Sequence, residues 1–479
     1  MDTKKLRQKI LDLAIRGKLV PQDPNDEPAS VLLERIKAEK ERLIKEGKIK
    51  KSKKSAKTSD TPHYENVPFE IPDNWVWTTL EEISNYGDCY NVSVTDIADD
   101  EWILELEDLE KDTASIIQKL SKKERNIKGV RHKFKKGDVL YSKLRTYLNK
   151  VLVAPKAGYC TTEIIPFNSY CDISTHYLCH VLRSAYFLDY TQQCGYGVKM
   201  PRLSTNDACK GMVPLPPLSE QQRIVMEIDK WFALIDQIEQ GKSNLQNTIK
   251  QTKSKILDLA IHGKLVPQDP NDEPAIELLK RINPDFTPCD NGHYPQLPDG
   301  WCVVTLKDLC ENINGLWKGK KEPFVNVGVI RNANFTKDFK LDYSNIEYID
   351  VEQRTFAKRH LENGDLIVEK SGGSDNNPVG RTILYEGKSG VFSFSNFTMA
   401  LRTKNSDIVL SKFLYYYILA KYQKGDMRLM QTQTTGLRNL ILDKFLSMPI
   451  HLPPLSEQKR IIDRIETIFT SLDMIMGSL

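Results

Sequence analysis

Residues 9–29 have the sequence KILDLAIRGKLVPQDPNDEPA, and residues 255–275 have the sequence KILDLAIHGKLVPQDPNDEPA. The two stretches agree at 20 of 21 positions and lie 246 residues apart. A second pair, LPPLSEQ at 215–221 and at 452–458, lies 237 residues apart. Repetition at such long spacing predicts a chain of two similar halves, each large enough to fold around its own core.

A weaker match between IPDNW at 71–75 and LPDGW at 297–301 has an offset of 226, so the first half carries 20 extra residues before this point. The insertion contains the run KAEKERLIKEGKIKKSKKSAK at 37–57, with nine Lys and one Arg against three Glu. High charge and few apolar residues predict a disordered linker here. Contact with phosphate groups is the alternative role for this run.

The composition excludes several classes of protein. The 479 residues carry 68 Lys and Arg against 64 Asp and Glu, a net charge of only +4, so a nucleic-acid partner would have to be met by local basic patches. The longest aromatic and apolar run, 413–420, is too short to span a bilayer, and the first residues lack the apolar segment of a signal peptide. Nine Cys residues without a C-x-x-C pair favour a reducing compartment, so we expect a cytoplasmic protein.

A long heptad series follows the first LPPLSEQ motif. Between Ser219 and His262 there is no proline and one glycine, and apolar residues recur in alternating steps of four and three that Lys242 and Thr252 complete. This spacing predicts a coiled-coil helix, with Ser219 as N-cap, Gln222 as its capping-box partner and Gly263 at its end. The predicted seam on this helix comprises Ile224, Ile228, Trp231, Ile235, Ile238, Leu245, Ile249, Ile256 and Leu259.

The repeat also supplies a partner for this seam. The matching positions lie in two separate places, at the N-terminus and at the C-terminus of the chain. The second copy of the long helix is therefore predicted to be split between the two ends, giving a wrapped, pseudo-twofold chain with two antiparallel long helices and adjacent termini. The matching seam positions are Leu6, Ile10 and Leu13, and Ile461, Ile465, Ile468, Leu472 and Ile475.

Two segments of about 150 residues separate the helical parts. Both mix short strand-like runs (138–142, 364–368, 381–385) with helical runs (175–188, 409–422), so we predict the α/β class for each. The predicted parts are an N-terminal helical part that pairs with the C-terminus (1–44), a Lys-rich linker (45–69), a first domain (70–216), a central region with the long helix (217–282), a linker (283–295), a second domain (296–453) and a C-terminal helix (454–479).

These motifs resemble the specificity subunits of type I restriction-modification systems. LPPLSEQ before a heptad helix and KLVPQDP, each present twice, are typical of that family. KLRTYLNK at 143–150 is similar to a family segment that has proline at the position of Thr146. GVKMPRL at 197–203 and QTQTTGLRNL at 431–440 resemble the segments that close the family's two target recognition domains. The resemblance covers nearly the whole chain, and the parts follow in the same order.

The resemblance implies a non-catalytic subunit of a restriction endonuclease and adenine methyltransferase complex. The two α/β domains would each read half of an asymmetric, bipartite sequence in double-stranded DNA. The long helices would set the spacing and dock two methyltransferase subunits, with two translocase-nuclease subunits joining for restriction. S-adenosylmethionine, ATP and Mg²⁺ are then expected in the partner subunits, with no cofactor in this chain and no membrane contact. Two alternatives stay open: a related assembly that lacks the translocase, and a coiled-coil scaffold with generic binding modules.

Arg and Lys reach guanine edges and Asn and Gln reach adenine edges, whereas Lys, Arg, Ser and Thr also contact phosphates. Polar clusters of this kind occur once in each domain, with an ordinary surface turn as the alternative, and with a core position as the alternative for Tyr147. In the first domain the candidates are Lys143, Arg145, Tyr147, Asn149, Lys150, Lys199 and Arg202. In the second they are Lys370, Ser371, Ser374, Asn376, Asn377, Arg381, Gln431, Gln433 and Arg438, with Gly372 and Gly373 between them.

Other chemistry finds little support. Cys171, His176, Cys179 and His180 have zinc-ligand types, but the second half has Lys412, Tyr415 and Tyr416 at the positions of His176, Cys179 and His180. The same scaffold therefore needs no metal, and we predict none. GKS at 241–243 and at 387–389 lacks the glycine five residues earlier that a phosphate-binding P-loop requires.

Overall fold

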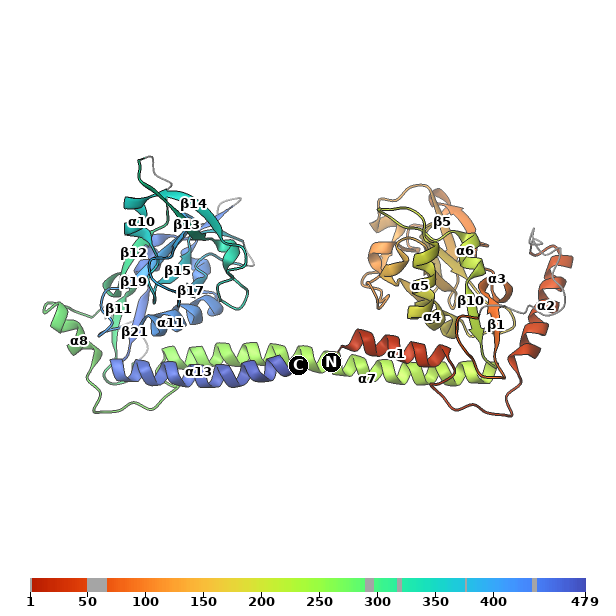
Figure 1. The fold of residues 1–479 in the computed structure, drawn as a ribbon, viewed down its shortest axis with the longest axis horizontal. Coiled ribbons are helices and arrows are strands. Elements are labelled where there is room, and N and C mark those ends of the chain that lie inside the picture. Colours follow the sequence, from red (N-terminus) through yellow and green to blue (C-terminus); the bar gives the residue numbers. More distant parts are fainter. Residues whose placement is uncertain (1, 50–66, 289–296, 317–320, 375–376, 433–436) are drawn as a thin grey trace. The chain divides into compact units, whose positions relative to one another are not determined.

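The computed structural model describes residues 2–49, 67–288, 297–316, 321–374, 377–432 and 437–479 (Figure 1). The chain divides into two compact units, unit 1 (Met1–Gly241) and unit 2 (Lys242–Leu479). The division falls inside helix α7 (Leu218–Ile261), which has 44 residues and confirms the predicted long helix. Gly263, with φ of +65°, ends it as predicted, because glycine adopts this left-handed conformation without steric cost.

In unit 1, helix α1 (Thr3–Ile15) lies along the first part of α7 (Figure 1). Ile10 belongs to the same buried cluster as Ile228 and Ile235. The Arg7 guanidinium forms ion pairs with Asp236 at 2.6 Å and with Glu239 at 3.1 Å, whereas the chain just after α1 contacts the start of α7. The two helices are therefore antiparallel.

In unit 2, helix α13 (Leu455–Ser478) lies along the last part of α7 in the same manner (Figure 1). Ile461 and Ile465 share a buried cluster with Leu257 and Ile261, and Lys253 pairs with Asp473 at 2.5 Å. Each part of α7 thus has an antiparallel partner from one end of the chain. This confirms the two-part second helix that the repeat predicts, whereas the adjacency of the two termini stays a prediction.

The buried seam is shorter than the heptad series. Ile10, Ile224, Ile228, Ile235, Ile249, Ile461 and Ile465 are buried, but Trp231, Ile238, Leu245 and Ile475 are exposed, which corrects the prediction for these four. A pair of helices buries only a narrow strip on each, so part of a wide apolar face stays in contact with solvent. The remaining predicted positions are half-buried, namely Leu6, Leu13, Ile256, Leu259, Ile468 and Leu472.

The predicted N-cap is also wrong. Helix α7 already begins at Leu218, so Ser219 lies inside its first turn. The Ser219 hydroxyl donates to the Asp26 carboxylate, which also pairs with Arg223 at 2.6 Å. The Ser219 hydroxyl is therefore hydrogen-bonded to the loop after α1, whereas the sequence motif predicts that it caps the helix.

Part of the Lys-rich insertion is helical, which corrects the prediction of disorder for that part. Helix α2 (Ala29–Lys45) buries Ile36, and its Lys40 ammonium donates at 2.6 Å to the carbonyl of Glu81 in α3 (Leu80–Ile83). Burial lowers the pKa of Lys40. The lysines elsewhere on α2 face solvent, so a high local charge accompanies an ordinary amphipathic helix. Residues 50–57 of the run lie outside the described residues.

The domain of unit 1 is closed by an antiparallel pair of strands, β1 (Val76–Thr79) and β10 (Met212–Leu215), which joins its two ends directly before α7. Above this pair lie a three-stranded sheet, β7-β6-β9, and a five-stranded sheet, β2-β5-β8-β3-β4. The elements between are β2 (Tyr90–Ser93), β3 (Trp102–Leu104), β4 (Leu120–Ser121), β5 (Val130–Phe134), β6 (Val139–Ser142), β7 (Val151–Val153), β8 (Gly158–Thr161), β9 (Ile164–Phe167), α4 (Thr175–Arg183), α5 (Ala185–Cys194) and α6 (Thr205–Lys210).

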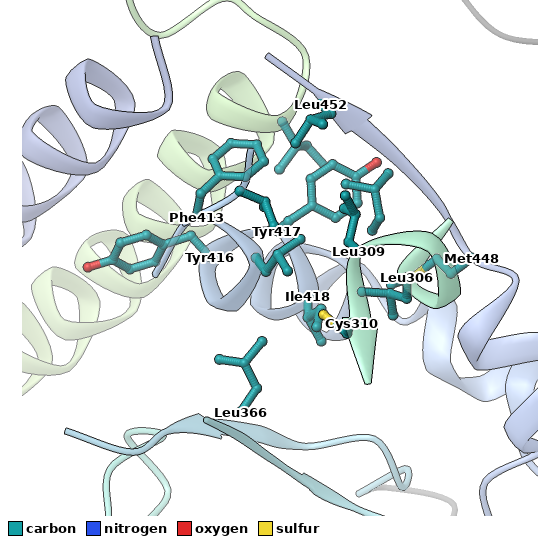
Figure 2. Close-up of a cluster of buried hydrophobic side chains, with 14 of the residues drawn as sticks. Leu306, Leu309, Cys310, Leu366, Phe413, Tyr416, Tyr417, Ile418, Met448 and Leu452 are labelled. Carbon is teal, nitrogen blue, oxygen red and sulfur yellow. The ribbon is translucent and has the colours of Figure 1, made fainter. Parts of the chain in front are cut away.

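The domain of unit 2 is closed in the same way by β11 (Cys302–Thr305) and β21 (Pro449–Leu452). Helix α11 (Ser411–Lys424) contributes Phe413, Tyr417 and Ile418 to the core shown in Figure 2. The other elements are α8 (Ala275–Ile282), α9 (Leu306–Leu309), β12 (Cys310–Asn314), β13 (Phe324–Ile330), β14 (Glu347–Glu352), α10 (Gln353–Arg359), β15 (Leu366–Glu369), β16 (Ser371–Gly373), β17 (Thr382–Leu384), β18 (Phe392–Phe394), β19 (Thr398–Thr403), β20 (Arg438–Asn439) and α12 (Leu442–Leu446).

The predicted strands near 138–142, 364–368 and 381–385 correspond to β6, β15 and β17. The predicted helix at 409–422 corresponds to α11. The predicted helix at 175–188 is interrupted, because Ser184 leaves helical geometry and caps α5 through its side chain. Both domains therefore belong to the predicted α/β class.

Candidate nucleic-acid interface

The same contacts fix the foot of each domain to its helix pair. In unit 1 the Trp75 indole donates to the Glu220 carboxylate at 2.9 Å, and the Gln22 amide donates to its other oxygen at 2.6 Å. In unit 2 the Trp301 indole donates to Glu457 at 2.9 Å, and Gln268 donates at 3.0 Å. We call these groups the foot contacts. Burial raises the pKa of both carboxyl groups.

A second repeated contact fixes a helix of each domain. The side-chain oxygen of Gln221 accepts from the backbone N–H of Ser174, the N-cap of α4, at 2.9 Å. The side-chain oxygen of Gln458 accepts from the N–H of Leu410, the N-cap of α11, also at 2.9 Å. The LPPLSEQ motif thus supplies a glutamate and a glutamine that both hold the domain in place.

The structure brings the two predicted segments of the first domain together. The Lys143 carbonyl accepts from the Leu203 N–H at 2.9 Å, and the Arg145 N–H donates to the Pro201 carbonyl at 2.7 Å. Arg145 has a φ of +51°, a left-handed conformation that turns the chain out of β6. The segments at 143–150 and 199–202, which are separated in sequence by residues 151–198, therefore form one surface.

The residues on this surface differ in what they are free to bind. Lys199 and Tyr147 are exposed. Asn149 is buried, and its amide donates to the Arg183 carbonyl at 3.3 Å. Lys150 donates to the Leu106 carbonyl at 2.7 Å, and burial lowers its pKa.

Arg202 is committed to a neighbour as well. It pairs with Glu163 at 3.1 Å, and the hydrogen bond to this carboxylate raises its pKa. Asn149, Lys150 and Arg202 therefore have structural partners. Tyr147 and Lys199 are exposed and Lys143 and Arg145 are half-buried, and contact of these four side chains with a ligand stays a prediction.

The second domain joins its predicted segments by the same backbone contact. The Lys370 carbonyl accepts from the Leu440 N–H at 2.8 Å, and β16 pairs with β20. The Lys370 ammonium donates to the side chain of Asn314 at 3.2 Å. Ser371 and Gly373 face Asn439 and Arg438 in this ladder.

Several predicted residues of the second domain have structural partners. Arg381 pairs with Glu369 at 3.3 Å and lies over the Phe335 ring at 5.2 Å. The side-chain oxygen of Gln431 accepts from the Val379 N–H at 3.3 Å. Ser374 Oγ accepts from the Asn377 N–H at 3.1 Å, and the Ser374 N–H donates to the Asn377 carbonyl at 2.8 Å. In a separate loop, Arg438 donates to the Thr432 carbonyl at 3.4 Å. Asn376 and Gln433 lie outside the described residues.

Two features, one on the candidate surface of each domain, were not predicted from sequence. Asn332 donates to the Ser371 carbonyl at 2.6 Å and lines a hollow of about 330 Å³ together with Phe397. In the first domain, Tyr196, Val198 and Met200 are exposed beside Lys199. The sequence signal for the second feature was a run of apolar residues that alternates with Gly197 and Lys199 in a segment of turn-forming residues.

The Cys and His side chains of unit 1 that are candidate zinc ligands by sequence have different neighbours. The Cys171 thiol donates to Glu39 at 2.7 Å, whereas the Cys179 thiol donates to the Val151 carbonyl at 3.7 Å. His180 is buried beside Phe232, and burial lowers its pKa to about 3. Among the described residues, no group of three or more His, Cys, Asp or Glu side chains is placed to hold an ion. A search of the same residues for helices able to cross a membrane also found none.

The fold and these surfaces define a duplicated protein, in which each α/β domain stands on its own helix pair and carries one polar candidate interface. The sequence matches the type I restriction modification DNA specificity domain family over residues 72–247 and 298–477. The chain belongs to this family, as a specificity subunit with two target recognition domains.

Individual relatives agree with this assignment. The EcoEI specificity subunit of Escherichia coli is 29% identical, with 99% of this chain and 90% of the relative covered. The EcoAI specificity subunit of Escherichia coli is 34% identical, with 69% and 66% covered. A chain from a structure of the assembly and conformational transition of a type I restriction-modification system has the same fold, with a TM-score of 0.59 at 18% identity and coverage of 86% and 94%.

Proposed function

We propose that the two target recognition domains each read one half of an asymmetric, bipartite sequence in double-stranded DNA. The observation that carries this proposal is the repeated contact between the Lys143 carbonyl and Leu203, and between the Lys370 carbonyl and Leu440. The two contacts fix equivalent surfaces on equivalent frames, yet the side chains around them differ. Unlike surfaces on like frames support the reading of two different half-sites.

The available side chains suit this role. In the first domain Arg145 and Lys143 are donors suited to guanine, and Lys199 is suited to a phosphate. In the second domain the ladder of Ser371 and Asn439 offers hydroxyl and amide groups. Because the whole chain has little net charge, we expect affinity to come from these local groups and from partner subunits.

We further propose that the helix pairs dock two methyltransferase subunits. Trp231, Leu234 and Ile238 are exposed on one face of α7 in unit 1, and Leu245, Met474 and Ile475 are exposed in unit 2. The three side chains of unit 1 follow one another at steps of three and four, which is typical of a helix face that a partner covers.

The chemistry of the complex belongs to the partners in this proposal. The methyltransferase subunits would bind S-adenosylmethionine, and two translocase-nuclease subunits would bind ATP and Mg²⁺, so that this chain selects the site without catalysing a step. We place the complex in the cytoplasm of a bacterial or archaeal cell.

Methylome sequencing of a host with this gene present and then deleted tests the proposal. We expect methylation at one bipartite, asymmetric sequence that disappears with the gene.

Arg145→Ala should lower the discrimination between bases in one half-site, and Lys370→Ala that in the other, each by about tenfold per base pair. Inserting four residues after Ser243 should lengthen the spacer between half-sites. Failure to bind any duplex in the presence of the methyltransferase would instead favour a scaffold with generic binding modules.

A further inference from the structure

A short hairpin at 195–202 projects from the first domain. The Tyr196 N–H donates to the Arg202 carbonyl at 3.0 Å, and the Arg202 N–H donates to the Tyr196 carbonyl at 2.9 Å, so these residues close the hairpin. Gly197, with a φ of +95°, makes the turn that a side chain would strain. The tip consists of the residues between these two ends.

The base of the hairpin is held firmly. Arg145 donates to the Pro201 carbonyl at 2.7 Å, Arg202 pairs with Glu163 at 3.1 Å, and Leu203 is buried directly after it. These contacts attach the hairpin to the turn after β6, which carries Lys143 and Arg145. The tip is therefore fixed in position beside the candidate interface.

The tip itself is apolar and exposed. Val198 is completely exposed (101%) and Met200 is exposed by 44%, and Tyr196 at the closing end of the hairpin is exposed by 57%. None of these side chains belongs to the buried core cluster of unit 1, so core packing does not account for them. Exposed apolar side chains that gather at one place are typical of a contact site.

The charges around the tip indicate what that contact is. Lys199 lies between Val198 and Met200, and Lys143 and Arg145 lie on the attached turn, whereas the neighbouring acid, Glu163, is occupied by Arg202. The area that a few side chains at one tip can bury is also far smaller than the roughly 800 Å² that each partner buries in a stable protein interface. Basic groups around a narrow apolar tip match a DNA duplex, whose backbone is anionic and whose base steps accept apolar wedges.

We propose that Val198, supported by Met200, is a wedge that enters a base step of the bound DNA and partly unstacks it, while Lys199 contacts the adjacent phosphate. The wedge rests on the proposed function, since it acts only if the first domain binds DNA. It adds a source of selectivity that needs no hydrogen bond to a base, because base steps differ in the energy needed to unstack them.

The experiment uses the full-length chain with its methyltransferase subunit and duplexes that carry the half-sites found by methylome sequencing. 2-Aminopurine is placed in turn at each position of the first half-site other than the methylated adenine, because its fluorescence rises when it unstacks. We expect a rise at one step with the unchanged protein. Val198→Ala should remove most of that rise and weaken binding about tenfold, and Val198→Leu should keep both.

Val130→Ala is the matched control, because Val130 is an exposed valine on β5 of the same domain. This variant should leave both the fluorescence and the affinity unchanged. Tight, specific binding without any fluorescence rise, or an unchanged rise in Val198→Ala, would overturn the wedge and leave the proposed function standing. A lack of binding by the unchanged protein would overturn both.

Discussion

In unit 1 the Trp75 indole donates to Glu220, and in unit 2 the Trp301 indole donates to Glu457, at 2.9 Å in both cases. The same agreement holds for the ion pairs Arg223–Asp26 and Arg460–Asp272, both at 2.6 Å. The foot of each domain is thus the same structure built twice. Buried groups that share hydrogen bonds are hard to change one at a time, because each leaves a partner unsatisfied.

The candidate interfaces differ although they begin from the same contact. After Lys143 the chain turns through left-handed Arg145, and the hairpin at 195–202 attaches to that turn. After Lys370 it continues as β16, which pairs with β20. A side chain that faces solvent or ligand has few partners to satisfy, so these surfaces tolerate change while the foot stays constant. The comparison separates a constant frame from replaceable surfaces.

The largest expected effect comes from charging the buried strip of one helix pair. Ile228 and Ile235 are buried between α1 and α7. Replacing both with Asp should lower the free energy of unfolding of unit 1 by about 4 kcal/mol or more, because unpaired carboxylates would be buried. Limited proteolysis should cut unit 1 first and leave unit 2 resistant.

Trp231→Asp is the matched control for this change. Trp231 lies on the same helix but is exposed, so its replacement should change stability by less than about 1 kcal/mol. It should nevertheless abolish co-purification with the methyltransferase if the exposed face is the docking site. Equal loss of stability in both variants would show that the exposed face also holds unit 1 together.

A smaller effect is expected at the two equivalent glycines after the repeated helices. Gly17 and Gly263 both have a φ of +65°, and a Cβ atom would lie 2.3 Å from a ring carbon of Pro72 or Pro298. Gly17→Ala and Gly263→Ala should therefore each cost about 2–3 kcal/mol, to be measured by thermal unfolding. Gly47→Ala, with a φ of +70° and open space around it, should cost only about 1 kcal/mol, so the difference isolates the proline clash.

The foot carboxylates give the stability a pH dependence that both units should share. Burial raises the pKa of Glu220 and of Glu457 in the folded state. The folded state then binds the proton more tightly than the unfolded state. The contribution of each carboxyl to the free energy of unfolding therefore falls as pH rises from the unfolded pKa, about 4.3, through the folded pKa.

Glu220→Gln should flatten this dependence and lower stability at neutral pH by about 1–2 kcal/mol, because an amide cannot accept from both Trp75 and Gln22. Glu457→Gln should do the same in unit 2. Melting temperatures measured from about pH 4 to about pH 7 check both variants. A pH slope that persists in the double variant would assign it to other groups.

The sequence predicted what depends on repetition and local periodicity. It located α7, the split second helix and the strands β6, β15 and β17, because these have strong patterns and a second copy for comparison. It did not predict that Trp231 is exposed or that the Lys40 ammonium contacts the Glu81 carbonyl. Apolar residues at helical spacing show that one face of a helix can be buried. Whether a neighbouring helix buries it depends on where that helix begins, which is a property of the tertiary structure.

The candidate residues were subject to the same limit. Residue type selected Lys143 and Arg145, which lie on the joined candidate surface, and equally Asn149 and Arg381, which have structural partners. A polar side chain has the same chemistry whether it holds a loop or binds a ligand, and only its neighbours distinguish the two. The exposed Val198 has the opposite character, and a search for polar groups could not select it.

The smallest expected effect is at the boundary of the two units. Gly241 lies in the interior of α7, and no atom lies within 4 Å of a Cβ placed there. Gly241→Ala should raise the free energy of unfolding by about 0.5–1 kcal/mol, because alanine loses less backbone entropy in a helix. Gly477→Ala, equally open but in the last turn of α13, should give a smaller gain because helix ends fray. Thermal unfolding of both variants measures this difference. Equal increases in the free energy of unfolding would mean that α7 frays at Gly241 as a helix end does.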